Sequence, residues 1–245
     1  MDATRPYWLT AFLDFPADEF DRGAAFWSQV TGWPLSPTRG EHDEFASLVP
    51  PDGADYLRLQ RLGEGETRLH LDVHVADPQE AAIAAQERGA SVVRQAYPDL
   101  VVLASPAGFE FCLVGQPRDT VPAAPHRPGG HRSRVSQVCL DIPPESHAEE
   151  VAFWAGTLHG QLRPAAGRPE LTWIDPPGPF PLQVVTQRLA LGNLVRGHLD
   201  IASDDRRAEV ERLRRHGAMV RSVRPERTVL EAPGGISLCV LDRAP

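Results

Sequence analysis

The residues best suited to chemistry in this sequence lie in one short alternating stretch. In Arg68-Leu-His-Leu-Asp-Val-His-Val75 polar and apolar residues alternate, which predicts a strand whose successive side chains point to opposite faces. His70, Asp72 and His74 then share one face, and the apolar residues between them share the other. An imidazole titrates near neutral pH, so this face could exchange protons with a bound molecule.

The same pattern returns in the second half of the chain as Arg196-Gly-His-Leu-Asp-Ile201. His198 lies 128 residues after His70 (198 − 70), and Asp200 keeps the same offset from Asp72, which indicates a tandem duplication. We therefore take His70 and His198 as the candidate catalytic residues.

Each of these side chains also has a structural interpretation. His70 and His198 could hydrogen-bond a neighbouring strand, and Asp72 and Asp200 could orient an arginine or a backbone amide. Three cysteines, Cys112, Cys139 and Cys239, are odd in number and lack close metal-type spacing. No evident cation lies near them in the sequence, so we predict buried, unreactive thiols.

The elements that position these residues can be predicted from the repeat. Strands end at prolines in Leu13-Asp-Phe-Pro16 and Leu140-Asp-Ile-Pro143, and an amphipathic helix follows each of them. Gly32 and Gly160 end these helices. In the first half we expect two short strands near 45–49 and 56–62 before the alternating strand.

A second helix follows the alternating strand in each half. Asp77 is a predicted N-cap with a proline directly after it, and Asp205 precedes the counterpart helix. Each half then closes with a loop and a strand. The chain is therefore predicted to be α+β, with two tandem domains of paired βαβββ modules at 1–117 and 133–245. A proline- and glycine-rich linker joins them at 118–132.

Composition excludes several classes of function. The 245 residues carry a net charge of −8 without a dense basic run, which argues against nucleic acid as a partner. No apolar stretch reaches bilayer-spanning length or forms a signal peptide, so we expect a cytoplasmic protein without a membrane partner. The sequence contains no lysine, which excludes Schiff-base catalysis through a side-chain amine.

Four motifs appear in the same order in both halves. In the first half they are the Ala25-Phe-Trp27 helix, the His70-Leu-Asp72 strand, the Gly89-Ala90 helix end and Pro106-Ala-Gly-Phe-Glu-Phe111. In these motifs the chain resembles the vicinal oxygen chelate superfamily of glyoxalases, bleomycin-resistance proteins and extradiol dioxygenases. The resemblance implies half-open barrels, or cups, around a small-molecule site. It leaves the function open, because the superfamily includes lyases, isomerases, dioxygenases, thiol transferases and drug-binding proteins.

The resemblance also implies where metal ligands would stand in metal-dependent members. They fall on Thr10, Gln60, His70 and Cys112 in the first half and on Gln137, Gln187, His198 and Cys239 in the second. None of these positions supplies a carboxylate, and a neutral amide is a poor substitute toward a divalent ion. We therefore predict no bound metal and no cofactor, although Glu110 shares the strand face of Cys112 and could restore a site.

These observations predict a metal-free cup that binds an organic small molecule, for resistance or sequestration or for proton-transfer chemistry. The alternative is a metal-dependent lyase, isomerase or dioxygenase, and a scaffold with filled cups is a third possibility. We expect the two domains to form an internal pseudo-dimer, and the first cup to bind its ligand more tightly. The candidate ligand-binding residues are Thr10, Phe12, Arg58, Gln60, Asp72, His74, Glu110, Gln137, Gln187 and Asp200.

Overall fold

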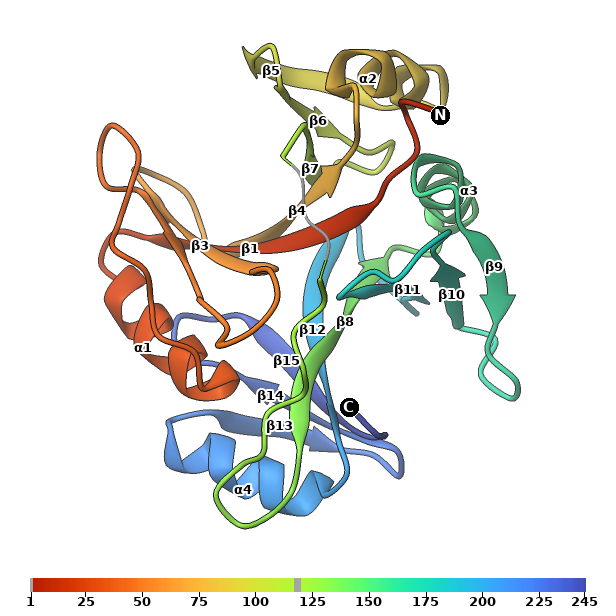
Figure 1. The fold of residues 1–245 in the computed structure, drawn as a ribbon. Helices are drawn as coiled ribbons and strands as arrows, with labels where there is room; N and C mark the ends of the chain where they lie inside the picture. The colour runs from red at the N-terminus through yellow and green to blue at the C-terminus, as the bar shows by residue number, and fades with distance from the viewer. Residues whose placement is uncertain (1, 117–119) are drawn as a thin grey trace. The chain divides into compact units, whose positions relative to one another are not determined.

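The computed structural model describes residues 2–116 and 120–245 (Figure 1). The predicted end of the first domain at residue 117 and the predicted start of the linker at residue 118 lie outside the described residues. The elements of the first half are β1 (Trp8–Pro16), α1 (Phe20–Thr31), β2 (Phe45–Ser47), β3 (Leu57–Leu62), β4 (Arg68–His74), α2 (Pro78–Glu87), β5 (Ser91–Tyr97), β6 (Leu100–Ala104) and β7 (Glu110–Val114).

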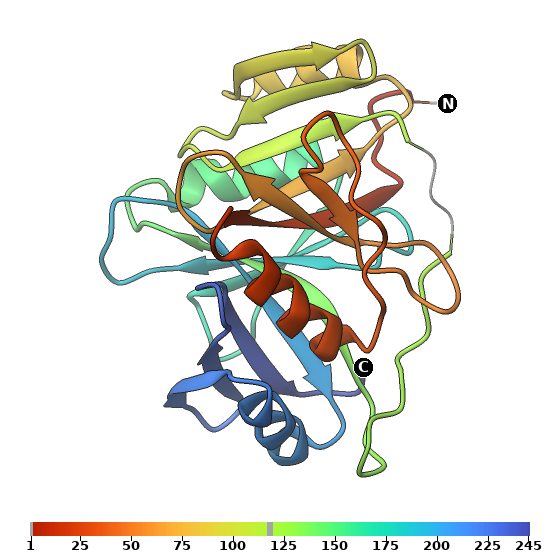
Figure 2. The same ribbon diagram turned by 90° about the vertical axis from the view of Figure 1, so that its left-hand side faces the viewer.

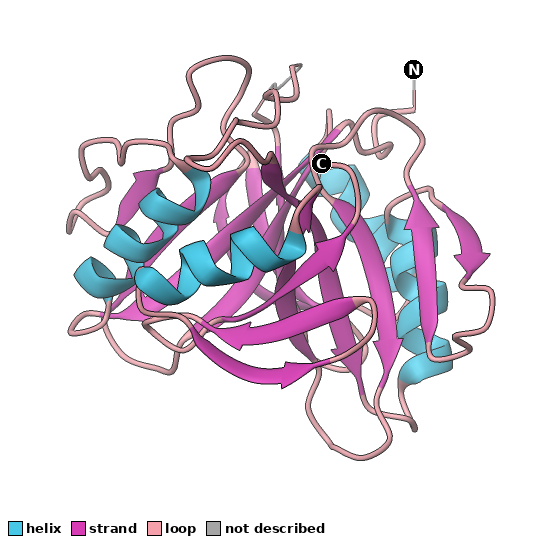
Figure 3. Ribbon diagram, turned by 90° about the horizontal axis from the view of Figure 1, so that it is seen from below, coloured by secondary structure: helices cyan, strands magenta, loops and turns pink. Residues whose placement is uncertain are grey.

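The second half repeats this order among the described residues. Its elements are β8 (Ser133–Ile142), α3 (His147–Thr157), β9 (Gln161–Pro164), β10 (Leu171–Asp175), β11 (Gln183–Arg188), β12 (Arg196–Ser203), α4 (Arg206–Arg215), β13 (Met219–Val223), β14 (Arg227–Glu231) and β15 (Ser237–Asp242). Where the second half has β9 directly after α3, the first half has only an isolated bridge between Leu35 and Leu48 among its described residues. Figure 3 distinguishes the helices from the strands.

Local sequence explains the helix boundaries. The Asp77 carboxylate accepts hydrogen bonds from the backbone N–H groups of Gln79 and Glu80, and Pro78 occupies the first turn of α2, as predicted. Gly32 ends α1 with a φ of 73°, a left-handed conformation that favours glycine. Among the described residues the longest helix, α1, has 12 residues, far short of the roughly 20 that cross a bilayer.

The strands form two open sheets, which confirms the predicted α+β class with two tandem domains. The strand orders are β2-β3-β1-β4-β7-β6-β5 and β13-β14-β15-β12-β8-β11-β10-β9. In each half, one strand carries both the histidine and the aspartate. This strand, β4 or β12, lies parallel to the last strand of its half, β7 or β15. Asp72 is therefore the register partner of Cys112, and Asp200 that of Cys239.

The chain divides into two compact units, and each unit combines a module from each half. Unit 1 contains Met1–Ala11, His70–Val121 and Val138–Gly197, and unit 2 contains Phe12–Leu69, Pro122–Gln137 and His198–Pro245. The units therefore do not coincide with the two halves of the duplication.

In unit 1, helices α2 and α3 cover one face of the strands. Helix α2 lies against the β5–β6 hairpin (Figures 1 and 2). The ring of Phe111 on β7 packs edge-on against Phe153 and Trp154 of α3, at centroid distances of 5.7 and 5.1 Å. The buried Glu150 of α3 accepts a 2.6 Å hydrogen bond from the backbone N–H of Ala107. A helix from the second half thus seals a sheet face of the first half.

In unit 2 the helix α1 approaches the loop before β15 very closely. Gly234 has a φ of 88°, and a Cβ placed there would lie 2.7 Å from the ring of Phe15. The same ring leaves no room for a Cβ on Gly23 of α1. Two glycines therefore allow helix, ring and loop to meet, because any larger side chain at either position would force the elements apart.

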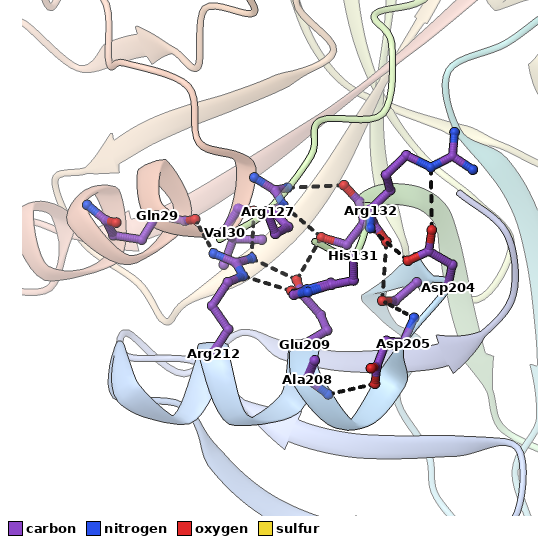
Figure 4. A network of polar contacts seen from close by, with 12 residues as sticks. Gln29, Val30, Arg127, His131, Arg132, Asp204, Asp205, Ala208, Glu209 and Arg212 are labelled. Atoms are coloured by element: carbon purple, nitrogen blue, oxygen red, sulfur yellow. Dashed lines mark hydrogen bonds and ion pairs between the residues drawn. The ribbon is translucent and has the colours of Figure 1, made fainter. Parts of the chain in front are cut away.

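A buried ion network also stabilises unit 2 (Figure 4). The Glu209 carboxylate on α4 accepts two 2.7 Å hydrogen bonds from Arg212 and one of 3.0 Å from Ser133. The Nε2 atom of His131 lies 2.8 Å from the same carboxylate. Glu209 has no exposed surface, so these partners replace the water that it loses on folding.

The arginines of this network bind the carboxyl end of α1. Arg212 donates hydrogen bonds to the carbonyls of Gln29 and Val30, and Arg127 donates one to the carbonyl of Thr31. These carbonyls lack helical partners and carry the negative end of the helix dipole, so a guanidinium is well suited to them. Arg127 and His131 belong to the predicted linker. That segment is part of the packing of unit 2 in addition to joining the two halves.

We expect Glu209→Gln to lower the free energy of unfolding by about 3 kcal/mol at neutral pH, because the variant leaves the buried Arg212 without a counter-charge. Burial acts to raise the pKa of the Glu209 carboxyl, but Arg212 and His131 outweigh it and the pKa lies below its ordinary value of 4.5. The contribution of Glu209 is therefore fully present above the unfolded-state pKa and is lost as the pH falls through the folded-state pKa.

Urea unfolding of both proteins at a series of pH values checks this. The difference between wild type and variant should shrink as the pH falls from about 6 to about 3. A difference that stays constant over this range would contradict the assignment of the charge to Glu209.

Candidate functional site

Unit 1 brings two predicted site residues and one cysteine into a single cluster. His70 and Asp72 lie on β4 and Cys112 lies on β7, and one donor atom of each lies within 4.8 Å of the donor atoms of the others. The Nε2 atom of His70 is 3.8 Å from the nearer oxygen of Asp72. All three side chains are buried. We call these residues the first cluster.

Unit 2 contains an equivalent cluster of His198, Asp200 and Cys239, the second cluster. Here the Nε2 atom of His198 lies 3.4 Å from the Asp200 carboxylate. Burial raises the pKa of the Cys239 thiol, and a hydrogen bond with His198 opposes this shift without cancelling it. The thiol therefore keeps its proton at neutral pH.

Both clusters lie on the sheet face that turns away from the helices. In unit 1, Leu71 is the register partner of Phe111, which packs under α3, so the alternating residues His70 and Asp72 face the other way. In unit 2, Leu199 pairs with Leu238 on the apolar face, and His198 and Asp200 again point to the opposite side. The predicted register of both strands agrees with this arrangement.

The remaining predicted residues of unit 1 have different surroundings. Thr10 and His74 are fully buried, with the Thr10 hydroxyl 2.9 Å from Nε2 of His74 and the carbonyl of Gln116 2.7 Å from Nδ1. Both ring nitrogens of His74 thus contact the protein, so the imidazole fixes the end of β4. Glu110 is half-buried on β7 and shares a face with Cys112, and Gln187 is half-buried on β11.

In unit 2 the predicted residues form a second group. Arg58 is buried, forms a 2.6 Å ion pair with Asp55 and lies over the ring of Phe12 at 5.9 Å. Gln60 pairs with Phe45 across the β2–β3 ladder. Gln137 is buried on β8.

Sequence analysis matched Cys112 and Cys239 to metal-ligand positions and predicted buried, unreactive thiols. Both are buried, and each lies beside the histidine and the aspartate of its own cluster. The nearer oxygens of Asp72 and Asp200 lie 3.8 and 3.4 Å from the histidine of their cluster, a neighbour that the sequence did not specify. Cys239 follows Cys112 by 127 residues (239 − 112), close to the offset of 128 between the histidines, so the repeat already marked the two thiols as equivalent.

The donor atoms decide which ion each cluster could hold. Each cluster offers one imidazole, one carboxylate and one thiol. Manganese and similar hard ions favour several oxygen ligands, and the positions that the superfamily uses supply no carboxylate. The residues therefore fit a manganese-type ion poorly, and they fit a thiophilic ion such as zinc better.

The comparisons with known proteins agree with this fold. The model of the glyoxalase-like domain family matches residues 10–114 and again residues 137–241. No curated protein sequence matches the chain significantly.

Solved structures of low sequence identity share the fold. The chain is similar to the Mn(II)-bound glyoxalase from Novosphingobium aromaticivorans, with 15% identity, a TM-score of 0.64, and coverage of 96% of this chain and 82% of the other. A halotolerant catechol dioxygenase has 12% identity and a TM-score of 0.66, with coverage of 97% and 87%. The chain is also similar to 2,2',3-trihydroxybiphenyl 1,2-dioxygenase from Sphingomonas wittichii strain RW1. The identity is 17% and the TM-score 0.60, with coverage of 97% of this chain and 89% of the other.

At these identities the structural similarity establishes the fold alone, whereas the family model covers most of both halves. The chain therefore belongs to the glyoxalase-like family of the vicinal oxygen chelate superfamily, with one family domain in each half of its tandem repeat.

Proposed function

We propose that this protein binds an organic small molecule at its His–Asp–Cys clusters and works without a metal ion. The bound molecule is either held, for resistance or sequestration, or undergoes proton transfer with His70 or His198 as the acid/base group. The observation that carries the proposal is the duplication of the cluster. The same three residue types recur at matching register positions on the helix-free face of both units.

The chemistry follows from the three groups. An imidazole that accepts a proton becomes a cation, and the Asp oxygen 3.4 to 3.8 Å away stabilises that cation electrostatically. The thiol of Cys239, which keeps its proton, can donate a weak hydrogen bond to an oxygen of the ligand. The histidine is thus the group suited to moving a proton, and the other two support it.

The two sites are not equal under this proposal. The first cluster has Glu110 on the same strand face as Cys112, whereas Ser237 stands at the matching place beside Cys239. We propose that the first site is therefore the stronger one. The proposed domains remain 1–117 and 133–245, paired as an internal pseudo-dimer.

Two measurements test this function. Native mass spectrometry of protein from its own producer cells detects a retained organic ligand, and proton NMR in deuterated water detects exchange of C–H protons next to the carbonyl of small 2-oxo acids and ketones. We expect one of these signals in the wild type. In the exchange measurement His70→Ala should lower the rate by about 100-fold, the usual range for loss of an acid/base group, and in the mass spectrum it should lower the amount of retained ligand; His198→Ala should have the smaller effect in both.

His42→Ala provides the matched control, because His42 is exposed and belongs to neither cluster. If His198→Ala loses more of the measured signal than His70→Ala does, the second site is the stronger one. If both variants retain the full signal, the histidines have no such function and the proposal fails.

One observation favours a second candidate, a metal-dependent lyase, isomerase or dioxygenase. In each cluster a single imidazole nitrogen lies within 4.8 Å of both a carboxylate oxygen and a thiol sulfur. Three donors that converge in this way could hold a zinc-type ion, with bond lengths of about 2.0 to 2.3 Å. Such an ion, when bound, would polarise a ligand oxygen.

Elemental analysis of protein purified without chelators decides between the two candidates. We expect less than about 0.1 equivalent of zinc, iron, manganese or nickel per chain, since forming the thiolate ligand requires removing a proton from a buried thiol. One or two equivalents that disappear in Cys112→Ser or Cys239→Ser would instead establish the metal-dependent candidate.

A further inference from the structure

Positive charge in this acidic chain is concentrated in one part of unit 2. Residues 206–227, which form α4, β13 and the start of β14, contain eight of the 25 basic residues and only three of the 33 acidic ones. The segment therefore has a formal charge of +5 (8 − 3), whereas the rest of the chain has −13 (−8 − 5). Its arginines are interspersed along the sequence, so the surface that they form depends on the fold.

Helical spacing brings three of these arginines onto one exposed side of α4. Arg207, Arg214 and Arg215 are exposed and lie at positions i, i + 7 and i + 8, which share a face of a helix. We call these three residues the arginine stripe. Arg214 forms a 3.1 Å ion pair with Glu211, which lies between them. The side chains of Arg207 and Arg215 form no ion pair or hydrogen bond among the described residues.

Helix stability does not account for the arginine stripe. A cation near the carboxyl end is favoured by the helix dipole, which explains Arg214 and Arg215. Arg207 lies in the first turn, at the positive end of the dipole, where a cation is unfavourable. The equivalent positions of α2, 128 residues earlier, hold Gln79, Ile83, Gln86 and Glu87. None of these is basic, so the fold itself does not require arginines here.

The arginine stripe borders an open groove. A hollow of about 750 Å³ lies between the last turns of α4 and the start of β13, lined by Glu211, Arg214 and Arg215 on one side and by residues 217–220 on the other (Figure 1). Met219 and Val220 are 51% and 38% exposed. The groove thus has a basic wall on the helix and an apolar wall on the strand.

A second hollow of about 590 Å³ continues the groove past Gly217 and Met219 toward the loop before β15. The charges around it are matched within the protein, because Arg22 pairs with Glu19 at 2.6 Å and Arg221 pairs with Glu231 at 2.7 Å. The free positive charge therefore lies at α4.

The histidine at the end of α4 senses this charge. Burial lowers the pKa of His216, and the charges of Arg212 and Arg215 lower it further. The groove consequently favours a negatively charged group at its helix wall.

The dimensions of the arginine stripe suit an extended peptide. Arg207 and Arg215 are eight residues apart, about 12 Å along the helix axis. In an extended chain every second side chain points to the same side, at intervals of about 7 Å. Alternating carboxylates would therefore face the arginines, and the side chains between them would face Met219 and Val220.

Other polyanions fit the groove less well. A nucleic acid needs flat side chains on which its bases stack, and the described residues that line the groove include no aromatic ring. Glu211 within the arginine stripe would repel a phosphate, whereas it can accept a hydrogen bond from a peptide N–H group.

Strand addition alone would not provide this recognition. β13 is the outermost strand of its sheet, but a bulge between Val220 and Ser222 interrupts its ladder. Side chains must therefore supply most of the specificity.

We propose that the groove between α4 and β13 binds an acidic segment of a partner protein, in an extended conformation in which acidic and apolar residues alternate. Its carboxylates pair with the arginine stripe, and its apolar side chains contact Met219 and Val220. The groove lies beside α4, whereas the second cluster of the same unit lies on the sheet face that turns away from the helices. The partner surface is therefore distinct from that cluster.

The test uses peptides of about seven residues, blocked at both ends, in which valine alternates with glutamate, glutamine or lysine. Calorimetric titration into the whole chain at an ionic strength of about 0.05 M gives their affinities. We expect the glutamate peptide to bind about tenfold more tightly than the glutamine peptide, and the difference to shrink as salt is added. Since the rest of the chain is acidic, general electrostatics would favour the lysine peptide, so a preference for glutamate reports the arginine stripe.

Variants at exposed positions locate the effect. Arg207→Gln/Arg215→Gln should lower the preference for glutamate over glutamine to below about threefold, and Arg207→Glu/Arg215→Glu should bind the lysine peptide more tightly than the glutamate peptide. Val220→Asp places a carboxylate on the apolar wall and should weaken the glutamate peptide. Arg94→Gln/Arg196→Gln removes two exposed arginines of β5 and β12 and is the control matched in charge, which should keep the full preference.

Equal affinity of the glutamate and glutamine peptides for the wild type would overturn the proposal, and no variant is needed for that result. An unchanged preference in Arg207→Gln/Arg215→Gln would overturn it as well. A short thymidine oligonucleotide that binds more tightly than the glutamate peptide would show that the arginine stripe is a nucleic-acid surface and that the assignment to a peptide is wrong.

Discussion

The parallel pairing of β4 with β7, and of β12 with β15, is the constraint on which both clusters depend. Parallel strands cannot be joined by a tight turn, so a long connection lies between the two members of each pair, and here it consists of a helix and a hairpin. This connection places Cys112 directly beside Asp72, and Cys239 beside Asp200, although 40 residues separate the first two (112 − 72). The polar clusters thus follow from strand topology.

Strand alternation and the repeat together made most of the fold predictable. The period of two in Arg68–His74 specified which residues face the helices, and the internal offset excluded a chance pattern. The caps at Asp77 and Gly32 were predictable for a local reason, since a cap depends on residues within one turn. The register that sets Asp72 opposite Cys112 was not predictable in this way, because no local pattern states which strand will pair with which.

The surroundings of individual site residues were equally inaccessible from the sequence. His74 resembles His70 in alternation, yet its two nitrogens contact Thr10 and Gln116, which come from segments far apart in the chain. The composition of the compact units is a similar case. The apolar stripe of α3 predicts that the helix is covered, but it does not specify that Phe111 of the other half provides the cover.

The helix–loop contacts of the two units restrict how the duplicated modules can be recombined. Gly23 of α1 corresponds to Glu150 of α3 (150 − 23 = 127), and Gly234 corresponds to Ala107 by the same offset. Unit 2 relies on two glycines around Phe15, whereas unit 1 relies on a carboxylate that reaches a backbone N–H. The two modules of each unit are therefore complementary to each other. Exchanging modules between the units would set Gly23 of α1 against Ala107, a combination that lacks both the second glycine and the carboxylate.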